Sequence, residues 1–266
     1  REGADSMAMK PMARFLAGAL PLVAVACGGS QPTAPPPTQA PAAPASTAAA
    51  PASAGSATLS GKVTFEGTAP AAEKVKLTAD PKCAAMHKDG LERQTIKVTD
   101  GGLADVLVYV KSGAAAGTAP AEPVLLDQKG CDYTPHMLAM VAGQKIRIRN
   151  SDDTLHNIHP RPKDNAEFNV GQPRQGMESE KSFDKPEMLI PVGCDVHPWM
   201  RAYISVLSHP YFAVTADDGT FTIKGLPAGE YEIEAIHAKL GKEKAVSGKV
   251  TVKDGEAGKL DLALKG

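Results

Sequence analysis

From residue 59 onward, apolar and polar residues alternate in short runs that Gly, Pro, Asp and Asn interrupt. The clearest runs lie at 61–65, 106–110, 145–149 and 203–207. A period of two, combined with many β-branched residues, is typical of half-buried strands. The pattern indicates a helical turn only around 81–88. We therefore predict an all-β protein built from β-sandwiches.

A second group of closely spaced strands is predicted after residue 209, at 211–215, 219–224, 229–237, 244–252 and 259–264. Asp217-Asp218-Gly219 and Pro227-Ala228-Gly229 separate the runs and are typical of turns. We expect a tight hairpin at Gly219. The sequence thus predicts a first domain over 58–208 and a second over 209–266.

The first sixty residues have a different character, because no Asp, Glu, Lys or Arg occurs between 15 and 61. Lys10 and Arg14 precede an apolar run at 15–26 that is typical of a secretory signal and too short to span a bilayer. The segment Ala24-Val25-Ala26-Cys27 resembles a lipobox, which implies lipidation of Cys27. We expect an exported protein of the periplasm or cell surface, anchored to the membrane by its lipid. Simple secretion after a signal peptide at 1–26 is the alternative.

The segment 27–57 is predicted to be a disordered tether. Residues 31–57 contain 7 Pro and 11 Ala among 27 residues, with Ser, Thr and Gln making up most of the rest. Such a composition cannot bury enough apolar surface to offset the entropy lost on ordering. The charge of the whole chain, 29 Lys and Arg against 30 Asp and Glu, also argues against a nucleic-acid-binding protein.

One segment carries donor atoms at metal-ligand spacing: Cys194-Asp195-Val196-His197-Pro198-Trp199-Met200, between two predicted strands. Thiolate and thioether sulfur favour copper, and a Cys with two His and a weak axial Met makes a blue-copper site. The second His is expected from the segment 150–159, at the end of another strand. Zinc held by the Cys and two His is possible, but Met is a poor zinc ligand. A buried Cys beside a surface His, without metal, is the remaining interpretation.

These two segments resemble the type 1 copper proteins, the cupredoxins, and the short loop is most similar to that of amicyanin. Asn150, Asp152 and His156-Asn157-Ile158 match the upstream motif of that family. The resemblance covers about residues 95–208 and implies a Greek-key β-sandwich with one type 1 copper ion. It implies His156, Cys194 and His197 as equatorial ligands and Met200 as the axial ligand.

The same resemblance implies roles for residues around the ligands. Asn157 would tie the two ligand loops together and hydrogen-bond the sulfur. The ring edge of His197 would reach the surface, with Pro198 and Trp199 in an apolar docking patch. Alternatively, Trp199 packs inside the protein. The segment 59–97 goes beyond a minimal cupredoxin and is not placed by the resemblance.

Two further cysteines remain if Cys27 is lipidated and Cys194 binds copper. Cys83 and Cys131 are then expected to form a disulfide, as cysteines outside the cytosol commonly do. The alternative is a second metal site, in which Cys83 with His87 and Cys131 with His136 supply the ligands. We expect His159, three residues from His156, to turn to the opposite side.

The C-terminal segment 217–233 resembles the carboxypeptidase regulatory-like, transthyretin-like β-sandwich. The resemblance rests on Asp218-Gly219-Thr220-Phe221 followed by Leu226-Pro227-Ala228-Gly229-Glu230-Tyr231. We find none of the protease, hydrolase or phosphate-loop motifs in the chain.

The sequence as a whole indicates a copper protein that carries single electrons between redox donor and acceptor proteins, and not an enzyme. Two alternatives remain. One is a cell-envelope binding or adhesion lipoprotein that has the fold without redox activity. The other is a copper storage or delivery protein that uses the same ligands with an exchangeable ion.

Overall fold

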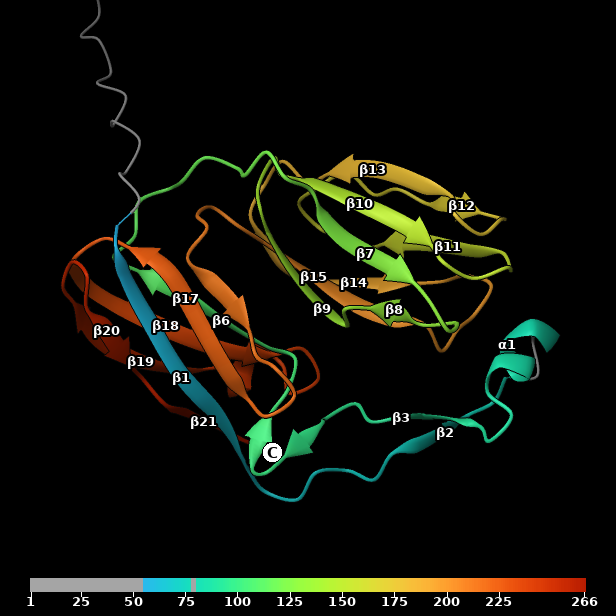
Figure 1. The fold of residues 1–266 in the computed structure, drawn as a ribbon, viewed down its shortest axis with the longest axis horizontal. Helices are drawn as coiled ribbons and strands as arrows, with labels where there is room; N and C mark the ends of the chain where they lie inside the picture. The colour runs from blue at the N-terminus through green and yellow to red at the C-terminus, as the bar shows by residue number, and fades with distance from the viewer. Residues whose placement is uncertain (1–54, 78–79) are drawn as a thin grey trace, which may run out of the picture. The chain divides into compact units, whose positions relative to one another are not determined.

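A computed structural model describes residues 55–77 and 80–266 of the chain. Within them the secondary structure is almost entirely β, as predicted (Figure 1). None of the described helices is long and apolar enough to cross a membrane. The predicted signal segment, Cys27 and the tether as far as residue 54 lie outside the described residues.

The first sandwich consists of two sheets with strand orders β13-β10-β7-β8 and β12-β11-β14-β15-β9. Its apolar core lies between these sheets and contains Ile146, Ile158 and Ile204 together with Cys194 and Met200. The strand bounds are β7 (Val124–Gln128), β8 (Tyr133–Thr134), β9 (Met137–Val141), β10 (Lys145–Asn150), β11 (His156–Pro160), β12 (Val170–Gln172), β13 (Glu178–Ser182), β14 (Glu187–Gly193) and β15 (Arg201–Leu207).

The second sandwich also has two sheets. One contains β1 (Ala57–Glu66), β4 (Val98–Thr99), β5 (Gly102–Leu103), β17 (Thr220–Leu226), β20 (Ala257–Lys259) and β21 (Leu262–Lys265). The other has the order β16-β6-β18-β19, formed by β6 (Val106–Ser112), β16 (Phe212–Val214), β18 (Gly229–His237) and β19 (Val246–Val252). A short 3-10 helix, η1 (Lys242–Lys244), lies between β18 and β19. The core of the second sandwich lies between these two sheets and contains Leu59, Val108, Phe221 and Ile233.

The strand pairing does not follow the predicted boundary at residue 209. The strand β1 pairs with β17, β20 and β21, and β6 pairs with β16 and β18. Both strands come from the segment predicted to form the copper domain. The C-terminal strands alone provide too few partners to bury both faces of their apolar residues, and β1 and β6 supply the missing edges.

The predicted hairpin at Gly219 is wrong, because the strands on its two sides belong to different sheets. The strand β16 pairs with β6, whereas β17 pairs with β1. Gly219 has a φ of +81° and packs against the β1 and β5 backbones, where a Cβ would lie 2.4 Å from the Val63 carbonyl oxygen. A glycine is therefore required here to turn the chain from one sheet to the other.

A third part, which we call the cap, consists of β2 (Glu73–Val75), β3 (Leu91–Arg93) and the short helix α1 (Pro81–Met86) between them. The helix confirms the turn predicted around 81–88. It begins at Asp80, whose side chain accepts hydrogen bonds from the backbone N–H groups of Lys82 and Cys83. Asp80 is thus a typical N-cap, with Pro81 in the first turn.

Candidate metal centre

The segment 194–200 connects two antiparallel strands, β14 and β15, at one end of the first sandwich. The His197 carbonyl accepts a 2.9 Å hydrogen bond from the Met200 N–H, and the Met200 carbonyl accepts one of 3.4 Å from the Cys194 N–H. These bonds close the loop on itself. The three side chains that the sequence singles out are therefore held in one short, hydrogen-bonded turn.

The His156 side chain comes from the first residue of β11 and is positioned by the preceding loop. Asn150 is fully buried and closes this loop, because its Nδ2 donates to the carbonyls of Thr154 and Gln172, each at 2.8 Å. Its Oδ1 accepts a hydrogen bond from the Asp152 N–H at 2.9 Å. The polar pattern 150–154 thus fixes where β11 starts.

Three donor atoms from these two loops meet inside the protein. The Nδ1 atoms of His156 and His197 lie 2.9 Å apart, and the Cys194 Sγ lies 3.7 Å from the His197 Nδ1. Ligand atoms of all three residues fall within 4.8 Å of one another, and both His side chains are fully buried. Donor atoms bound to one ion at roughly 2.0–2.3 Å are separated by distances of this size. The donor set therefore fits a single metal ion.

Asn157 links the two ligand loops, as the resemblance implies. Its Oδ1 accepts hydrogen bonds from the Cys194 Sγ at 3.2 Å and from the Asp195 N–H at 2.8 Å. Its own carbonyl accepts a 2.5 Å hydrogen bond from the buried Tyr133 hydroxyl. One side chain therefore fixes both the position of the sulfur and the direction in which the second loop leaves β14.

Each histidine directs its second ring nitrogen to a carboxylate. The His156 Nε2 lies 2.9 Å from Asp152 Oδ2, and the His197 Nε2 lies 3.1 Å from Asp80 Oδ2. A carboxylate at Nε2 holds the proton there and leaves Nδ1 free to bind metal, and it also makes the ligand nitrogen more basic. Both rings are therefore oriented for a metal ion on the side of Cys194.

The hydrogen bonds among these side chains favour a charged pair, a Cys194 thiolate with a His156 imidazolium. Burial raises the pKa of the Cys194 thiol, but hydrogen bonds with His156 and His197 outweigh it and bring the pKa down to about 6. Burial lowers the pKa of His156, while its hydrogen bonds with Asp152 and Cys194 raise it to about 9. A cysteine that ionises this readily is a good metal ligand, because the thiolate is the form that binds.

Met200 is also fully buried and belongs to the same core as Cys194. It is the last residue of the loop and directly precedes β15. Its place in the same core as Cys194 is compatible with the axial role that the resemblance implies, and that role stays a prediction.

The prediction that the His197 ring reaches the surface is wrong. His197 is 0% exposed, and the cap covers it: Asp80 contacts its Nε2, and the Cys83 Sγ lies 3.7 Å from the same atom. Trp199 is half-buried, lies 5.0 Å from the His197 ring between centroids, and donates its Nε1–H to the Cys131 carbonyl. The apolar docking patch predicted around this ring is thus replaced by a contact with the protein's own cap.

Cys83 and Cys131 are joined by a disulfide that links the cap to the first sandwich. The alternative second metal site is not assembled by the described residues. The His87 Nε2 contacts the Gly130 carbonyl at 2.8 Å, and the His136 Nδ1 contacts the Arg201 carbonyl at 3.2 Å.

His159 points away from the donor set, as expected from its spacing. Its Nδ1 lies 3.0 Å from Asp195 Oδ2, and its Nε2 lies 2.6 Å from Glu167 Oε1. These contacts raise the pKa of His159, the Glu167 hydrogen bond most of all. His159 therefore belongs to a polar network beside the loop.

Sequence reasoning missed the role of the two carboxylates. The sequence motif includes Asp152 but does not indicate its contact with His156, and no sequence pattern points to a contact between Asp80 and His197. Asp80 stands in an Asp-Pro pair that signals a helix start, but that signal says nothing about a histidine 117 residues away. Only the fold brings Asp80 to His197.

We expect Asp80→Asn to lower the affinity of the site for Cu²⁺ by about 10–100-fold, the usual effect of losing such a partner of a ligand. Asparagine still caps α1 but removes the negative charge at the His197 Nε2. The measurement is a competition titration of Cu²⁺ against a chelator, with circular dichroism to verify the fold. Asp153→Asn is the matched control, because Asp153 is exposed and pairs with Lys82. Equal affinities of the two variants would contradict the assigned role.

Comparison with known proteins gives similarity to solved structures only, since no family model and no curated protein matches the chain. The copper-containing nitrite reductase of Thermus scotoductus is 20% identical, and the match covers 36% of this chain and 25% of that one, with a TM-score of 0.31. A purple cupredoxin from Nitrosopumilus maritimus is 20% identical, covering 32% of this chain and 99% of that one, with a TM-score of 0.28. The amicyanin of Paracoccus versutus is 20% identical, covering 38% of this chain and 97% of that one, with a TM-score of 0.30. Similarities of this size transfer no function to the chain.

Proposed function

We propose that this chain is an exported type 1 copper protein that carries single electrons between a donor and an acceptor protein. The observation that supports this most is the buried set of His156, Cys194 and His197, whose ligand atoms lie within 4.8 Å of one another. Two nitrogens and one thiolate in a loop-closed site favour copper among the common metals. When bound, copper supplies a reversible one-electron couple.

The residues around the site hold the ligands in place. The hydrogen bonds within 194–200 and from Asn157 fix the sulfur, and Asp152 and Asp80 fix the two rings. Because both loops lie at the end of a packed sandwich, the ligand atoms have little freedom to rearrange. Such rigidity favours electron transfer, in which ligand positions should change little between the two oxidation states.

The covered site argues against the copper delivery alternative. His197 is fully buried beneath a cap that a disulfide attaches to the first sandwich. An ion that is handed over to another protein needs an accessible ligand, whereas an electron does not. In the loop itself, Val196 is 40% exposed, and we propose that a redox partner approaches the site there and at the neighbouring Asp195.

Export, lipidation of Cys27 and attachment to a membrane are part of the same proposal and rest on the sequence of the first sixty residues. In this arrangement the copper site would work outside the cytosol, at the end of a Pro- and Ala-rich tether. The carboxypeptidase regulatory-like identity of the second sandwich also stays a proposal, supported by the motifs at 218–231.

The experiment that tests the copper function is a visible absorption spectrum of the full chain loaded with Cu²⁺. We expect an intense blue or green band from charge transfer between the Cys194 thiolate and the metal. The same chain loaded with Zn²⁺ is the control and stays colourless. A colourless Cu²⁺ form that loses its metal on gel filtration would contradict the proposal and favour a binding protein without redox activity.

A further inference from the structure

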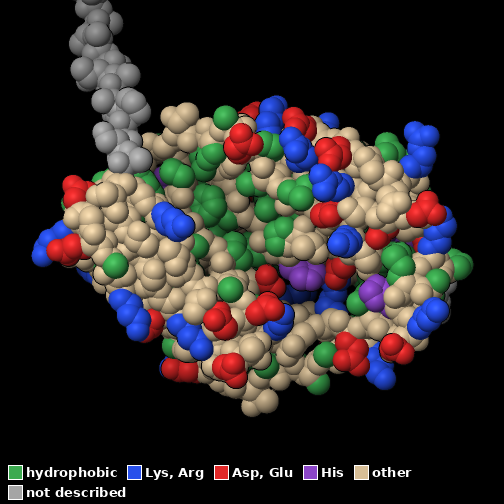
Figure 2. Space-filling model, viewed as in Figure 1, with side chains coloured by type: hydrophobic (Ala, Val, Ile, Leu, Met, Phe, Trp, Pro, Cys, Tyr) green, Lys and Arg blue, Asp and Glu red, His purple; other side chains and the backbone are tan. Residues whose placement is uncertain are grey.

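A cavity of about 550 Å³ lies next to the metal loop, outside the donor set. The residues that line it come from the cap and the segment after it (73–76, 93, 95 and 105), from the start of β9 (136–137), from the residues 198–203 that follow His197, and from the end of β18 with the residues after it (237–239). Figure 2 shows a hollow on this face with a histidine and several charged side chains around it. The volume falls in the range of small-molecule sites.

The wall formed by the first sandwich contains aromatic and apolar residues beside His136 and Arg201. Trp199, Tyr203, Met137 and Pro198 all contribute to it. Trp199 is held by its hydrogen bond to the Cys131 carbonyl, so its ring is fixed in the wall. Flat aromatic surfaces of this kind favour a planar ring, which packs against them by stacking or edge contacts.

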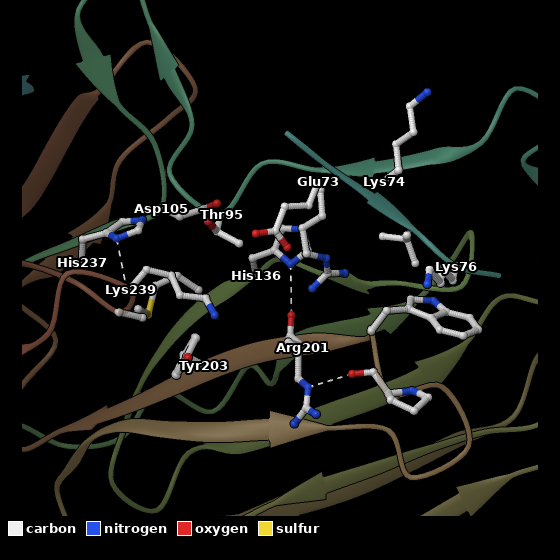
Figure 3. Close-up of a pocket in the computed structure, with 16 residues that line it drawn as sticks. Glu73, Lys74, Lys76, Thr95, Asp105, His136, Arg201, Tyr203, His237 and Lys239 are labelled. Atoms are coloured by element: carbon white, nitrogen blue, oxygen red, sulfur yellow. Dashed lines mark hydrogen bonds between the residues drawn. The ribbon is translucent and has the colours of Figure 1, made fainter. Parts of the chain in front are cut away.

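The charges around the cavity favour an anion. Five Lys or Arg residues line it against two acidic residues, Glu73 and Asp105, although the Lys74 side chain points away from it (Figure 3). Lys76 lies at one end of the cavity and Lys239 at the other (Figure 3). No described carboxylate lies within 4.0 Å of either ammonium group.

Arg93 adds a donor without a partner. It lines the cavity and pairs with Asp132 through Nη2 at 2.6 Å, but its Nε is buried and has no hydrogen-bond partner among the described residues. A buried donor left unpaired costs free energy, so this Nε adds to the cost of placing Arg93 at the cavity, and the Arg93 charge is already paired with Asp132.

We propose that this cavity binds a small aromatic anion, such as an aromatic carboxylate. The ring packs against Trp199 and Tyr203, and the anionic group lies among the basic side chains. The assignment concerns the metal-free protein and does not depend on the proposed copper function. It places the ligand beside Trp199, whose ring centroid is 5.0 Å from that of the copper-ligand candidate His197.

The single tryptophan of the chain makes the proposal directly testable, because Trp199 lines the cavity. The experiment titrates the metal-free full chain with 4-nitrobenzoate, a nitroaromatic quencher, and follows Trp199 fluorescence, with calorimetry as a second readout. The neutral 4-nitrobenzyl alcohol and the cationic 4-nitrobenzylammonium ion are titrated in the same way. We expect saturable quenching by the anion, with an affinity about tenfold higher than that of the neutral analogue and the cation weakest.

Two variants locate the binding. Lys76→Gln with Lys239→Gln is expected to weaken 4-nitrobenzoate binding about tenfold. The matched control, Lys145→Gln with Lys224→Gln, changes two exposed lysines outside the cavity and should leave binding unchanged. Only linear, unsaturable quenching by all three compounds, or equal affinity for the anion and the neutral analogue, would overturn the proposal. An equal loss in both double variants would also overturn it, because the anion would then respond to overall charge alone.

Discussion

Cys194→Ser is expected to abolish the visible absorption band of the Cu²⁺-loaded protein. The band requires a thiolate bound to the metal, and Cys194 is the free cysteine among the described residues. Serine occupies a similar volume, so the fold should persist, but its hydroxyl is a harder and far weaker ligand. We expect the affinity for Cu²⁺ to fall by more than about 100-fold, which exceeds the usual effect of a residue that only supports a ligand.

The measurement combines the absorption spectrum with a chelator competition titration. Two histidine variants serve as a matched pair. His156→Gln should lose the band, because its Nδ1 belongs to the donor set, whereas His159→Gln should keep it, because His159 contacts Glu167 and Asp195. A band that persists in Cys194→Ser would rule out the assigned ligand set.

Removal of the Cys83–Cys131 disulfide is expected to have the largest effect on stability. The bond joins residues 48 positions apart and links the cap to the first sandwich. For a loop of that length, the chain-entropy model gives a loss of about 4 kcal/mol in the free energy of unfolding. The double variant Cys83→Ser with Cys131→Ser should therefore show a lower denaturation midpoint in urea, with a steeper slope because the denatured chain without the cross-link exposes more surface.

The same double variant should release copper to a chelator faster than the wild type does, because the cap that buries His197 is no longer covalently held. Treating the wild type with a reductant should reproduce both effects, which separates the loss of the bond from the change of side chains. Asp153→Asn in the oxidised protein is the control for a change near the cap that leaves the disulfide intact. An unchanged unfolding free energy would show that the noncovalent contacts of the cap, such as the Arg93–Asp132 ion pair, are sufficient to hold it.

The cap also limits how the redox partner that we propose could reach the candidate metal site. Asp80, the disulfide and Trp199 surround the outer side of His197 and leave its ring without exposed surface. Cys131 and Trp199 lie within the part of the chain that the resemblance to cupredoxins covers, but Asp80 and Cys83 come from a segment that it does not cover. A site that the loop alone would leave open is thereby closed by residues more than a hundred positions earlier in the chain.

The sequence by itself determined the fold class, and it pointed to His156, Cys194 and His197 as a candidate donor set whose residues lie together in the structure. Alternation with a period of two predicted several of the longer strands, such as β1, β6, β10 and β15, since it reflects which side of a sheet faces the core. His197 and Met200 follow Cys194 within one short loop, so the loop's own hydrogen bonds bring them together. Asn150 and Asp152 likewise act within the few residues before His156. Local spacing is sufficient in these cases because the interacting groups are neighbours along the chain.

Only the tertiary structure decided the arrangement of distant segments. The strands β1 and β6 join the C-terminal sandwich, although nothing in their own patterns distinguishes them from strands of the first. Asp80 reaches His197, and Trp199 donates a hydrogen bond to the Cys131 carbonyl, through contacts that no local signal encodes. Alternation specifies that a strand has a buried face but not which sheet covers it, and a capping residue specifies a helix start but not what the helix covers. The composition of the core and the closure of the metal site therefore follow from long-range packing.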